Sequence, residues 1–202
     1  MLNNALKKSN TVAIGGHIRP DGDCVGSCMG LYHYIRKAFP NIDVDVYLEE
    51  IPERFHMLAD TDVIKHEISD QVYDLFIVLD CGDSARLGFS YPLFENACHT
   101  LCVDHHVSNN SFAEENHIVP EASSTSELVY RLIDKDKITN EIAECLFLGI
   151  VHDTGVFQYS CTSPETMEAA ADLMRKDICP NEIIDKTFYE KTYAQNQILA
   201  RT

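Results

Sequence analysis

The sequence predicts a three-layer α/β domain, in which helices cover both faces of a parallel β-sheet. Its first half alternates short apolar runs with amphipathic stretches, a pattern typical of parallel strands joined by helices. Three of these apolar runs end in Asp or His residues, at the end of a strand where parallel sheets bind ligands. The chain has 202 residues and is 45% hydrophobic, which is enough for one principal core.

The predicted elements follow from the periodicity of the apolar residues. Four short apolar runs predict strands over Thr11–Gly15, Val44–Leu48, Leu75–Leu79 and Thr100–Val103. Helical spacing and capping signals predict helices over Cys24–Ala38, Thr125–Asp134, about 140–151, Pro164 to about Lys176, and from Pro180 onward. Ser124 and Ser163 are the clearest predicted N-caps, each with an acidic residue in the turn that follows.

The end of the sequence predicts a further helix. From Phe188 to Thr202 a polar-apolar helical pattern continues without a glycine or proline to close it. We therefore expect a catalytic domain over residues 1–187, and in residues 188–202 the start of a linker helix to a second domain that this sequence does not contain.

The charge balance limits the kind of partner. There are 16 Lys and Arg against 32 Asp and Glu, a formal charge of −16, which opposes an electrostatic grip on a long nucleic acid duplex. An anionic substrate would need cations from bound metals, from a partner domain or from a second subunit. No apolar run reaches the roughly 20 residues of a membrane-spanning helix, and no signal peptide opens the chain, so we expect a cytoplasmic protein without a membrane partner.

The eight cysteines predict buried, reduced thiols. Cys24 and Cys28 are four residues apart, as are Cys98 and Cys102, which is not the CxxC spacing of a zinc site. Several of the cysteines lie in apolar runs, which favours burial over a disulfide or a metal-binding role.

Polar residues at the ends of the predicted strands form the candidate site. His17, Asp21 and Asp23 follow the first strand, Asp80 follows the third, and Asp104, His105 and His106 follow the fourth; Asp153 comes after an apolar helix. These segments can converge outside the carboxyl ends of a parallel sheet. Carboxylates gathered there would repel one another unless divalent cations neutralised them.

Imidazole and carboxylate donors without thiolate favour manganese, iron, cobalt or zinc, and we expect two divalent ions, most simply Mn²⁺. Two metals about 3.5–4 Å apart can stabilise both the attacking and the leaving oxygen at phosphorus. The predicted chemistry is therefore phosphoester hydrolysis by a hydroxide that both metals activate.

Four motifs in order resemble those of the DHH phosphoesterase superfamily. They are Gly16–Ser27, Val78–Asp83, Val103–His106 with the name-giving Asp-His-His, and His152–Gly155. Within the superfamily the chain most resembles the bacterial oligoribonuclease (nanoRNase) and pAp-phosphatase branch, on the Ala122–Glu127 and Asp153–Phe157 segments. The resemblance implies a DHH catalytic domain, and the usual second domain with its glycine-rich substrate motif is not found in this sequence.

The resemblance also implies residue roles. His17, Asp21 and Asp80 would hold one metal, and Asp23, Asp80, His105 and Asp153 the other, with Asp80 as the bridge. His106 would face the scissile phosphate, Asp104 would orient a histidine, and Ser123, Ser124 and Thr125 would line the substrate cleft. For His152 a core histidine is favoured over a ligand.

Several functions remain open at this point. The leading hypothesis is hydrolysis of short oligoribonucleotides or pAp, with a homodimer as one arrangement. The alternatives are a cyclic or linear dinucleotide phosphodiesterase, an inorganic pyrophosphatase of the same superfamily, and a non-catalytic module that binds metals and nucleotides.

Overall fold

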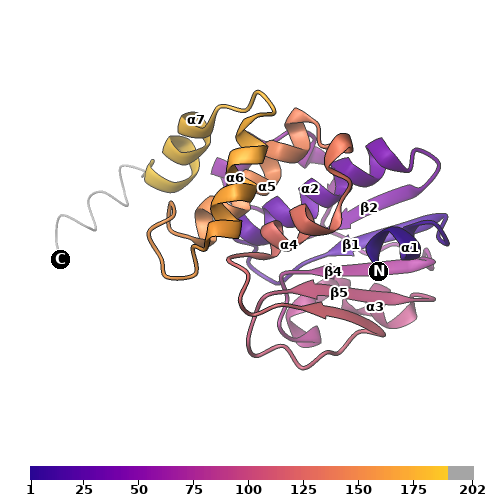
Figure 1. The fold of residues 1–202 in the computed structure, drawn as a ribbon. Helices are drawn as coiled ribbons and strands as arrows, with labels where there is room; N and C mark the ends of the chain where they lie inside the picture. Colours follow the sequence, from indigo (N-terminus) through magenta and orange to yellow (C-terminus); the bar gives the residue numbers. More distant parts are fainter. Residues whose placement is uncertain (191–202) are drawn as a thin grey trace.

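The computed structural model describes residues 1–190 and has a single six-stranded sheet at its centre (Figure 1). All strand pairs are parallel, which confirms the predicted fold class. The strands are β1 Thr11–Gly15, β2 Asp43–Tyr47, β3 Ile64–Lys65, β4 Leu75–Leu79, β5 Thr100–Asp104 and β6 Glu115–Ile118.

The strand order β3-β2-β1-β4-β5-β6 places a topological switch point between β1 and β4. From β1 the chain adds β2 and β3 on one side, then returns to add β4, β5 and β6 on the other. In such open α/β sheets the crevice beyond the carboxyl ends at the switch point is the usual ligand site. His17 follows β1 and Asp80 follows β4, so the topology places both residues at this crevice.

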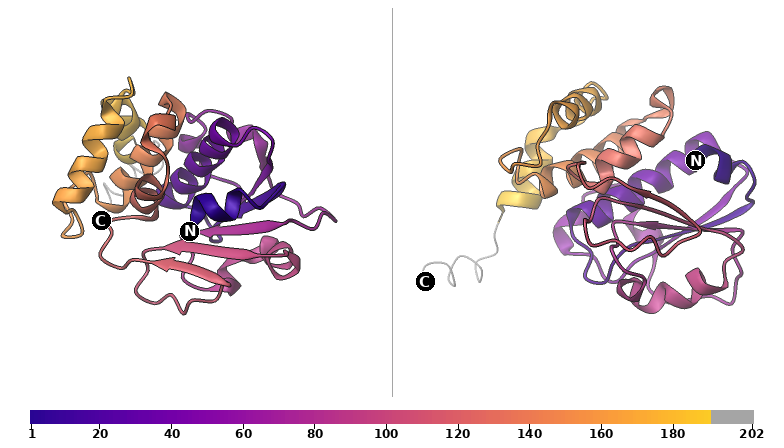
Figure 2. Two further views of the ribbon diagram at one scale, coloured as in Figure 1. Left: turned by 45° about the vertical axis from the view of Figure 1, so that its right-hand side comes forward. Right: turned by 60° about the horizontal axis from the view of Figure 1, so that its bottom comes forward.

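The helices cover the two faces unequally. They are α1 Leu2–Leu6, α2 Gly22–Ala38, α3 Tyr91–Asn96, α4 Thr125–Leu132, α5 Asn140–Asp153, α6 Pro164–Met174 and α7 Pro180–Ile184, which continues into a π-helical turn over Asp185–Tyr189. Both views in Figure 2 show the later helices, in orange and yellow, on the side of the sheet away from the pink helix α3. One face therefore carries a thick helical layer, and the other is covered mainly by α3 and the turn before it.

Four central strands were predicted correctly to within one residue, whereas four short elements were missed. The strands β3 and β6 and the helices α1 and α3 have between two and six residues each. The strand β6, Glu-Asn-His-Ile, lies at an edge and is half-exposed, so it lacks the apolar run of a central strand. The predicted helix boundaries differ from the observed ones by about two residues, the usual uncertainty of helix ends.

Helices α2 and α5 approach each other closely along a glycine seam, formed by Gly26 and Gly30 on α2 and Gly149 on α5. A Cβ atom added at Gly26 would lie 2.5 Å from the carbonyl oxygen of Cys145, and one at Gly149 would lie 2.7 Å from Asp23 Oδ1. Larger residues would push the helices apart. The seam therefore holds the first turn of α2, with Asp23, close to α5.

The remaining sequence predictions concern the cysteines and the chain end. All eight cysteines are free, and Cys24, Cys28, Cys81, Cys102 and Cys145 are buried, as expected for reduced thiols. None of the described helices is long and apolar enough to cross a membrane. The linker helix predicted for residues 188–202 lies largely outside the described residues, and the boundary after residue 187 stays a prediction.

Candidate metal centre

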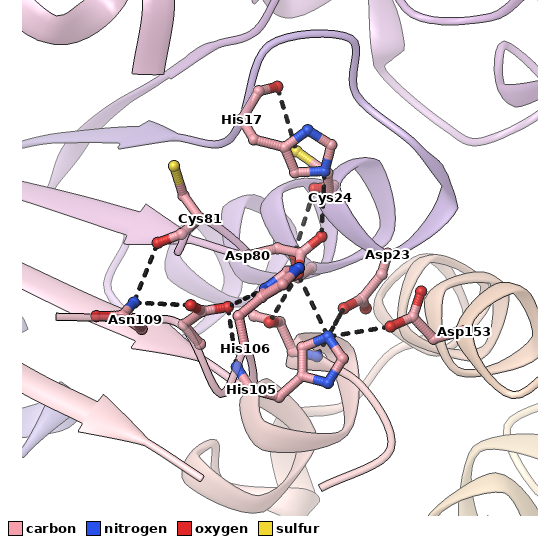
Figure 3. Close-up of polar contacts among 12 residues, drawn as sticks. His17, Asp23, Cys24, Asp80, Cys81, His105, His106, Asn109 and Asp153 are labelled. Carbon is pink, nitrogen blue, oxygen red and sulfur yellow. Dashed lines mark hydrogen bonds and ion pairs between the residues drawn. The ribbon is translucent and has the colours of Figure 1, made fainter. Parts of the chain in front are cut away.

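Five predicted ligands converge at the carboxyl end of the sheet (Figure 3). Asp80 Oδ2 lies 3.5 Å from His17 Nε2, and Asp80 Oδ1 lies 3.6 Å from His105 Nε2. His105 Nε2 also lies 3.0 Å from Asp153 Oδ2 and 3.9 Å from Asp23 Oδ2. The two oxygens of Asp80 thus face two different histidines.

The donor atoms fall into overlapping groups of metal-binding geometry. One group combines His17, Cys24 and Asp80, and a second combines Asp23, His105 and Asp153; in each, the donor atoms lie within 4.8 Å of one another. A third such group, Asp80 with both histidines of the Asp-His-His motif, links the first two. Among the described residues Asp80 therefore stands between two places where a cation could bind.

Asp21 lies at the exposed side of the cluster. It is the N-cap of α2, and its Oδ1 accepts hydrogen bonds from the amides of Asp23 and Cys24 at 3.1 Å. Its Oδ2 lies 3.6 Å from His17 Nε2. The cap begins the helix at Gly22, two residues before the predicted start, because the Asp21 side chain satisfies the first free amides.

Asp23 is fully buried and is held by the start of another helix. Its Oδ2 accepts from the amide of Thr125 at 2.6 Å, and its Oδ1 from the amide of Ser126 at 2.8 Å. Both amides belong to the first turn of α4, where the helix dipole favours an anion. Burial, together with the Asp80 and Asp153 carboxylates, nevertheless raises the pKa of Asp23 well above its ordinary value.

The raised pKa values of the two histidines beside Asp80 indicate an excess of negative charge around them. Burial opposes protonation of His17, but hydrogen bonds with Asp21 and Asp80 outweigh it and raise its pKa to about 11. Burial also opposes protonation of His105, yet Asp153 and the neighbouring carboxylates raise its pKa to about 10. A cluster that draws protons onto its histidines favours cations. A divalent metal fits this set of imidazole and carboxylate donors and would displace those protons.

Cys24 is an additional group that the sequence reasoning did not include in the site. Its Sγ lies within the first donor group. Burial raises the pKa of this thiol well above its ordinary value, so it remains protonated, and only the thiolate is a good metal ligand. The carboxylate and imidazole donors remain the chemically suited ones.

Asp80 has a backbone conformation that is rare for residues other than glycine. Its φ is +55°, in the left-handed region that Asp and Asn tolerate better than most residues. Such strain is concentrated at functional sites, where the surrounding structure imposes it. The turn aims a side chain that is only 2% exposed into the space between His17 and His105.

Asp104, His106 and Asn109 form a hydrogen-bonded chain at one side of the cluster. Asp104 is fully buried, and its Oδ1 accepts from His106 Nδ1 at 2.7 Å, while its Oδ2 accepts from the Asn109 amide at 2.7 Å. The contact between Asp104 and a histidine was predicted. The hydrogen bond with Asp104 outweighs burial and raises the pKa of His106.

Asn109 itself was missed. It also donates to the carbonyl oxygen of Cys81 at 3.1 Å and so joins the segments that follow β4 and β5. No sequence signal marked it, because a single amide in a polar loop has no periodicity.

Ser123, Ser124 and Thr125 do not line an open cleft, and their predicted role needs correction. All three are at most 1% exposed. Ser124 caps α4, Ser123 Oγ donates to the buried Glu127 carboxylate at 2.5 Å, and Thr125 Oγ1 donates to Asp80 Oδ1 at 3.2 Å. Their polar groups are used to hold α4 and the carboxylates in place.

His152 is partly buried and packs against aromatic rings, and the core role favoured from the sequence stays a prediction. Its Nε2 lies 3.0 Å from the Thr187 hydroxyl, which itself donates to the Ile183 carbonyl oxygen, so His152 must donate. Its ring packs edge-on against Phe55 and Phe188. Burial lowers its pKa to about 4, which keeps the ring neutral.

Taken together, the fold and this cluster form a candidate metal centre at the switch point of a doubly wound sheet. Residues 11–150 match the description "DHH family, N-terminal domain", and the chain belongs to the DHH family. Phosphoesterases of this family use divalent metals, and the described residues include the donor groups to hold them.

The chain is similar to two bacterial proteins that have the same name. It is 31% identical over 176 residues to a probable bifunctional oligoribonuclease and PAP phosphatase NrnA of Streptococcus mutans, covering 85% of this chain and 54% of that protein. It is 24% identical over 188 residues to the bifunctional oligoribonuclease and PAP phosphatase NrnA of Bacillus subtilis, covering 90% and 58%. These similarities confirm the predicted branch.

A solved structure agrees with the fold. The crystal structure of an exopolyphosphatase-related protein from Bacteroides fragilis superposes with a TM-score of 0.90 at 25% identity, covering 99% of this chain and 62% of that one. The chain thus spans between 54% and 62% of the length of these three relatives.

Proposed function

We propose that this chain is the metal-binding catalytic half of a phosphoesterase that hydrolyses short oligoribonucleotides and pAp. The observation that carries this proposal is the position of Asp80, with one oxygen 3.5 Å from His17 Nε2 and the other 3.6 Å from His105 Nε2. A carboxylate shared in this way can bridge two metals, an arrangement suited to in-line displacement at phosphorus. The names of the two bacterial relatives support the substrate class.

The donor set supports a division of the residues between two metals. The first would be held by His17, Asp21 and Asp80, and the second by Asp23, Asp80, His105 and Asp153. Mixed imidazole and carboxylate donors suit Mn²⁺. When bound, the metals supply the charge that neutralises the phosphate and the Lewis acidity that activates water.

The chain's own residues supply orientation and a proton. His106 lies beside Asp80 at 3.6 Å and is held through Nδ1 by Asp104, which leaves Nε2 for the substrate. A protonated His106 can stabilise the phosphate and donate a proton to the leaving oxygen. Asp104 is a positioning residue, since it fixes the ring and favours its protonated form.

Substrate affinity would depend on groups outside the described residues. The 16 Lys and Arg are outnumbered by 32 Asp and Glu, which opposes phosphate binding, and the relatives extend well beyond the part that matches this chain. We infer that, in proteins of this kind, the part that the match does not cover completes the substrate cleft. The cytoplasmic location and the homodimer stay predictions.

The test uses the full-length protein loaded with Mn²⁺. Ribonucleotides of two to five residues should release mononucleotides, pAp should release phosphate, and metal analysis should find two equivalents per chain. Pyrophosphate and cyclic dinucleotides serve as competing substrates that test the alternative functions. Two bound metals without product from the oligoribonucleotides or pAp would contradict the proposal.

A further inference from the structure

A cavity lies at the same end of the sheet as the metal centre. It has a volume of about 650 Å³, which is enough for a nucleoside-sized group. Its lining residues follow three neighbouring parallel strands: Arg19 and Pro20 after β1, Glu49 to Pro52 after β2, and His66 after β3. Phe89, from the turn before α3, completes the wall.

The cavity and the metal centre share one loop. Residues 17–21 run from His17, beside Asp80, through Arg19 and Pro20 in the cavity wall. This loop is fixed at two points: the amide of Ile18 donates to the Arg86 carbonyl oxygen at 2.7 Å, and the amide of Arg19 donates to Glu49 Oε2 at 2.7 Å. A ligand that extends from the metal centre across this loop reaches the cavity.

The lining chemistry favours a neutral flat ring over a phosphate. Glu49 and Glu50 place two carboxylates in the wall beside Arg19 and His66, whose Nε2 lies 3.8 Å from Glu50 Oε1, so the wall has no excess of positive charge to attract a phosphate dianion. Pro20, Ile51, Pro52 and Phe89 give apolar surface to the same wall. Glu50 is exposed enough to accept hydrogen bonds, with its side chain 83% accessible, and carboxylates accept from the amino groups of bases.

We propose that this cavity is a subsite for one nucleobase of the substrate, which packs on Phe89 and the two prolines while its phosphodiester lies at the metals. The subsite rests on the proposed function, because it is a binding place for the substrate of that function. It lies beyond the carboxyl ends of β1, β2 and β3. Stacking of bases on aromatic side chains tolerates different bases, so the subsite contributes affinity with little sequence selectivity.

The kinetic test compares Phe89→Ala with a matched control in the full-length protein loaded with Mn²⁺. Tyr91→Ala is the control, since Tyr91 is a partly exposed aromatic residue two positions away that does not line the cavity. The substrates are a trinucleotide and three versions of it, each with one abasic position. Phe89→Ala should raise KM for the intact trinucleotide about tenfold and leave kcat within twofold.

One abasic substrate should behave differently from the others. Loss of the base that occupies the cavity should raise KM in the unmodified protein by a similar factor, and Phe89→Ala should add nothing further on that substrate. Tyr91→Ala should leave every KM within twofold. Equal losses for Phe89→Ala on the intact and all abasic substrates would overturn the subsite.

A binding test separates the subsite from the proposed function. Saturation-transfer NMR with adenosine detects weak binding without any hydrolysis, and ribose 5-phosphate serves as the ligand without a base. Adenosine should receive saturation from the unmodified protein and from Tyr91→Ala, but not from Phe89→Ala. If this pattern holds and no substrate is hydrolysed, the proposed function fails, while the cavity is still shown to bind a nucleobase. If adenosine receives no saturation, or receives it equally from Phe89→Ala, the subsite is wrong whatever is hydrolysed.

Discussion

The glycine seam between α2 and α5 and the carboxyl end of the sheet differ in residue type: the seam is apolar, and the carboxyl end is rich in ionisable residues. In the seam, Gly26 and Gly149 bring two helix backbones together among buried apolar side chains. At the carboxyl end, Asp23, Asp80 and Asp153 gather around His105. The difference teaches that the seam is suited to stability and the carboxyl end to binding cations.

The two regions are nevertheless coupled through the same two helices. Asp23 lies in the first turn of α2, and Asp153 is the last residue of α5. The separation of these carboxylates is therefore set by how closely the seam lets the helices approach. Substitutions in the seam should change mainly stability, and substitutions at the carboxyl end should change mainly metal binding and activity. At Gly149, which lies close to Asp23, a substitution should change both stability and metal affinity.

The largest expected effect is that of Asp80→Asn at the carboxyl end. Asn keeps the shape of the side chain and tolerates the left-handed backbone at this position. Loss of the shared carboxylate should release both metals and lower activity about 10³- to 10⁴-fold, because metals supply several kcal/mol of transition-state stabilisation. Metal analysis and steady-state kinetics measure both effects.

Stability without metal should fall as well. With a chelator present, Asp80→Asn should be less stable than the unmodified protein, because Asp80 is the shared carboxylate that faces His17 and His105 and favours their protonated forms. Denaturant unfolding in the presence of chelator tests this. One metal equivalent retained by the variant would show that Asp80 is not shared.

Gly149→Ala is the corresponding change in the seam. The added Cβ would lie 1.9 Å from Ser126 Oγ and 2.7 Å from Asp23 Oδ1, so α5 must move away from α4 and α2. Overpacking of this kind should cost about 3 kcal/mol of unfolding free energy. Metal affinity should fall as well, because the shift separates Asp23 from Asp153.

Gly30→Ala is the control for that change. Its added Cβ would lie 2.6 Å from Leu146 Cδ2 and 2.9 Å from Leu146 Cγ, which belong to a side chain and not to the backbone, so Leu146 can shift without moving α5. Its cost should be about 1 kcal/mol, with metal affinity unchanged. Similar metal losses in both variants would mean that the seam does not set the carboxylate separation.

His106→Ala separates chemistry from metal binding within the carboxyl end. Loss of a positioned proton donor typically lowers turnover 10²-fold or more, and we expect about 10²-fold here with both metals retained. Asp104→Asn should lower turnover about tenfold and shift the alkaline limb of the pH profile to lower pH. The shift follows because Asp104 raises the pKa of His106, and the protonated ring is the donor. An unshifted limb would contradict the positioning role.

The same contrast explains what the sequence could predict. The four central strands and the convergence of five candidate ligands were accessible because buried strands have apolar runs and the DHH motifs are ordered along the chain. The edge strands β3 and β6 were not, since a half-exposed edge has neither a continuous apolar run nor a strict alternation. The start of α2 was misplaced because Asp21 is both its cap and part of the first metal-binding motif, and only the second role was predicted.

Contacts between distant segments were less predictable. Asn109 reaches Asp104 and the Cys81 carbonyl oxygen only after β4 and β5 lie side by side. Ser123 and Thr125 have the composition of a ligand-binding loop, yet their hydroxyls are consumed by Glu127 and Asp80. Polarity at a motif therefore indicated the right region but could not separate a substrate contact from a support for another carboxylate.

The smallest expected effect concerns His152, which lies on α5 with its ring against Gly22. His17 and His105 gain protons in the fold, whereas burial lowers the pKa of His152 to about 4 from the ordinary value of 6.5. Below pH 6.5 the unfolded chain therefore binds a proton that the folded protein excludes, so this residue's contribution to stability falls as pH drops toward 4. Between pH 7 and 5.5 the loss should be about 1 kcal/mol.

His152→Gln isolates that contribution, because Gln can still donate to Thr187 but does not titrate. The measurement is denaturant unfolding at pH 7 and 5.5, with a chelator present so that metal release does not contribute. The unmodified protein should lose about 1 kcal/mol more than the variant over this interval. Equal losses would mean that folding does not lower the pKa of His152. The helical layer would then differ less from the carboxyl end, where carboxylates favour the protonated forms of His17 and His105.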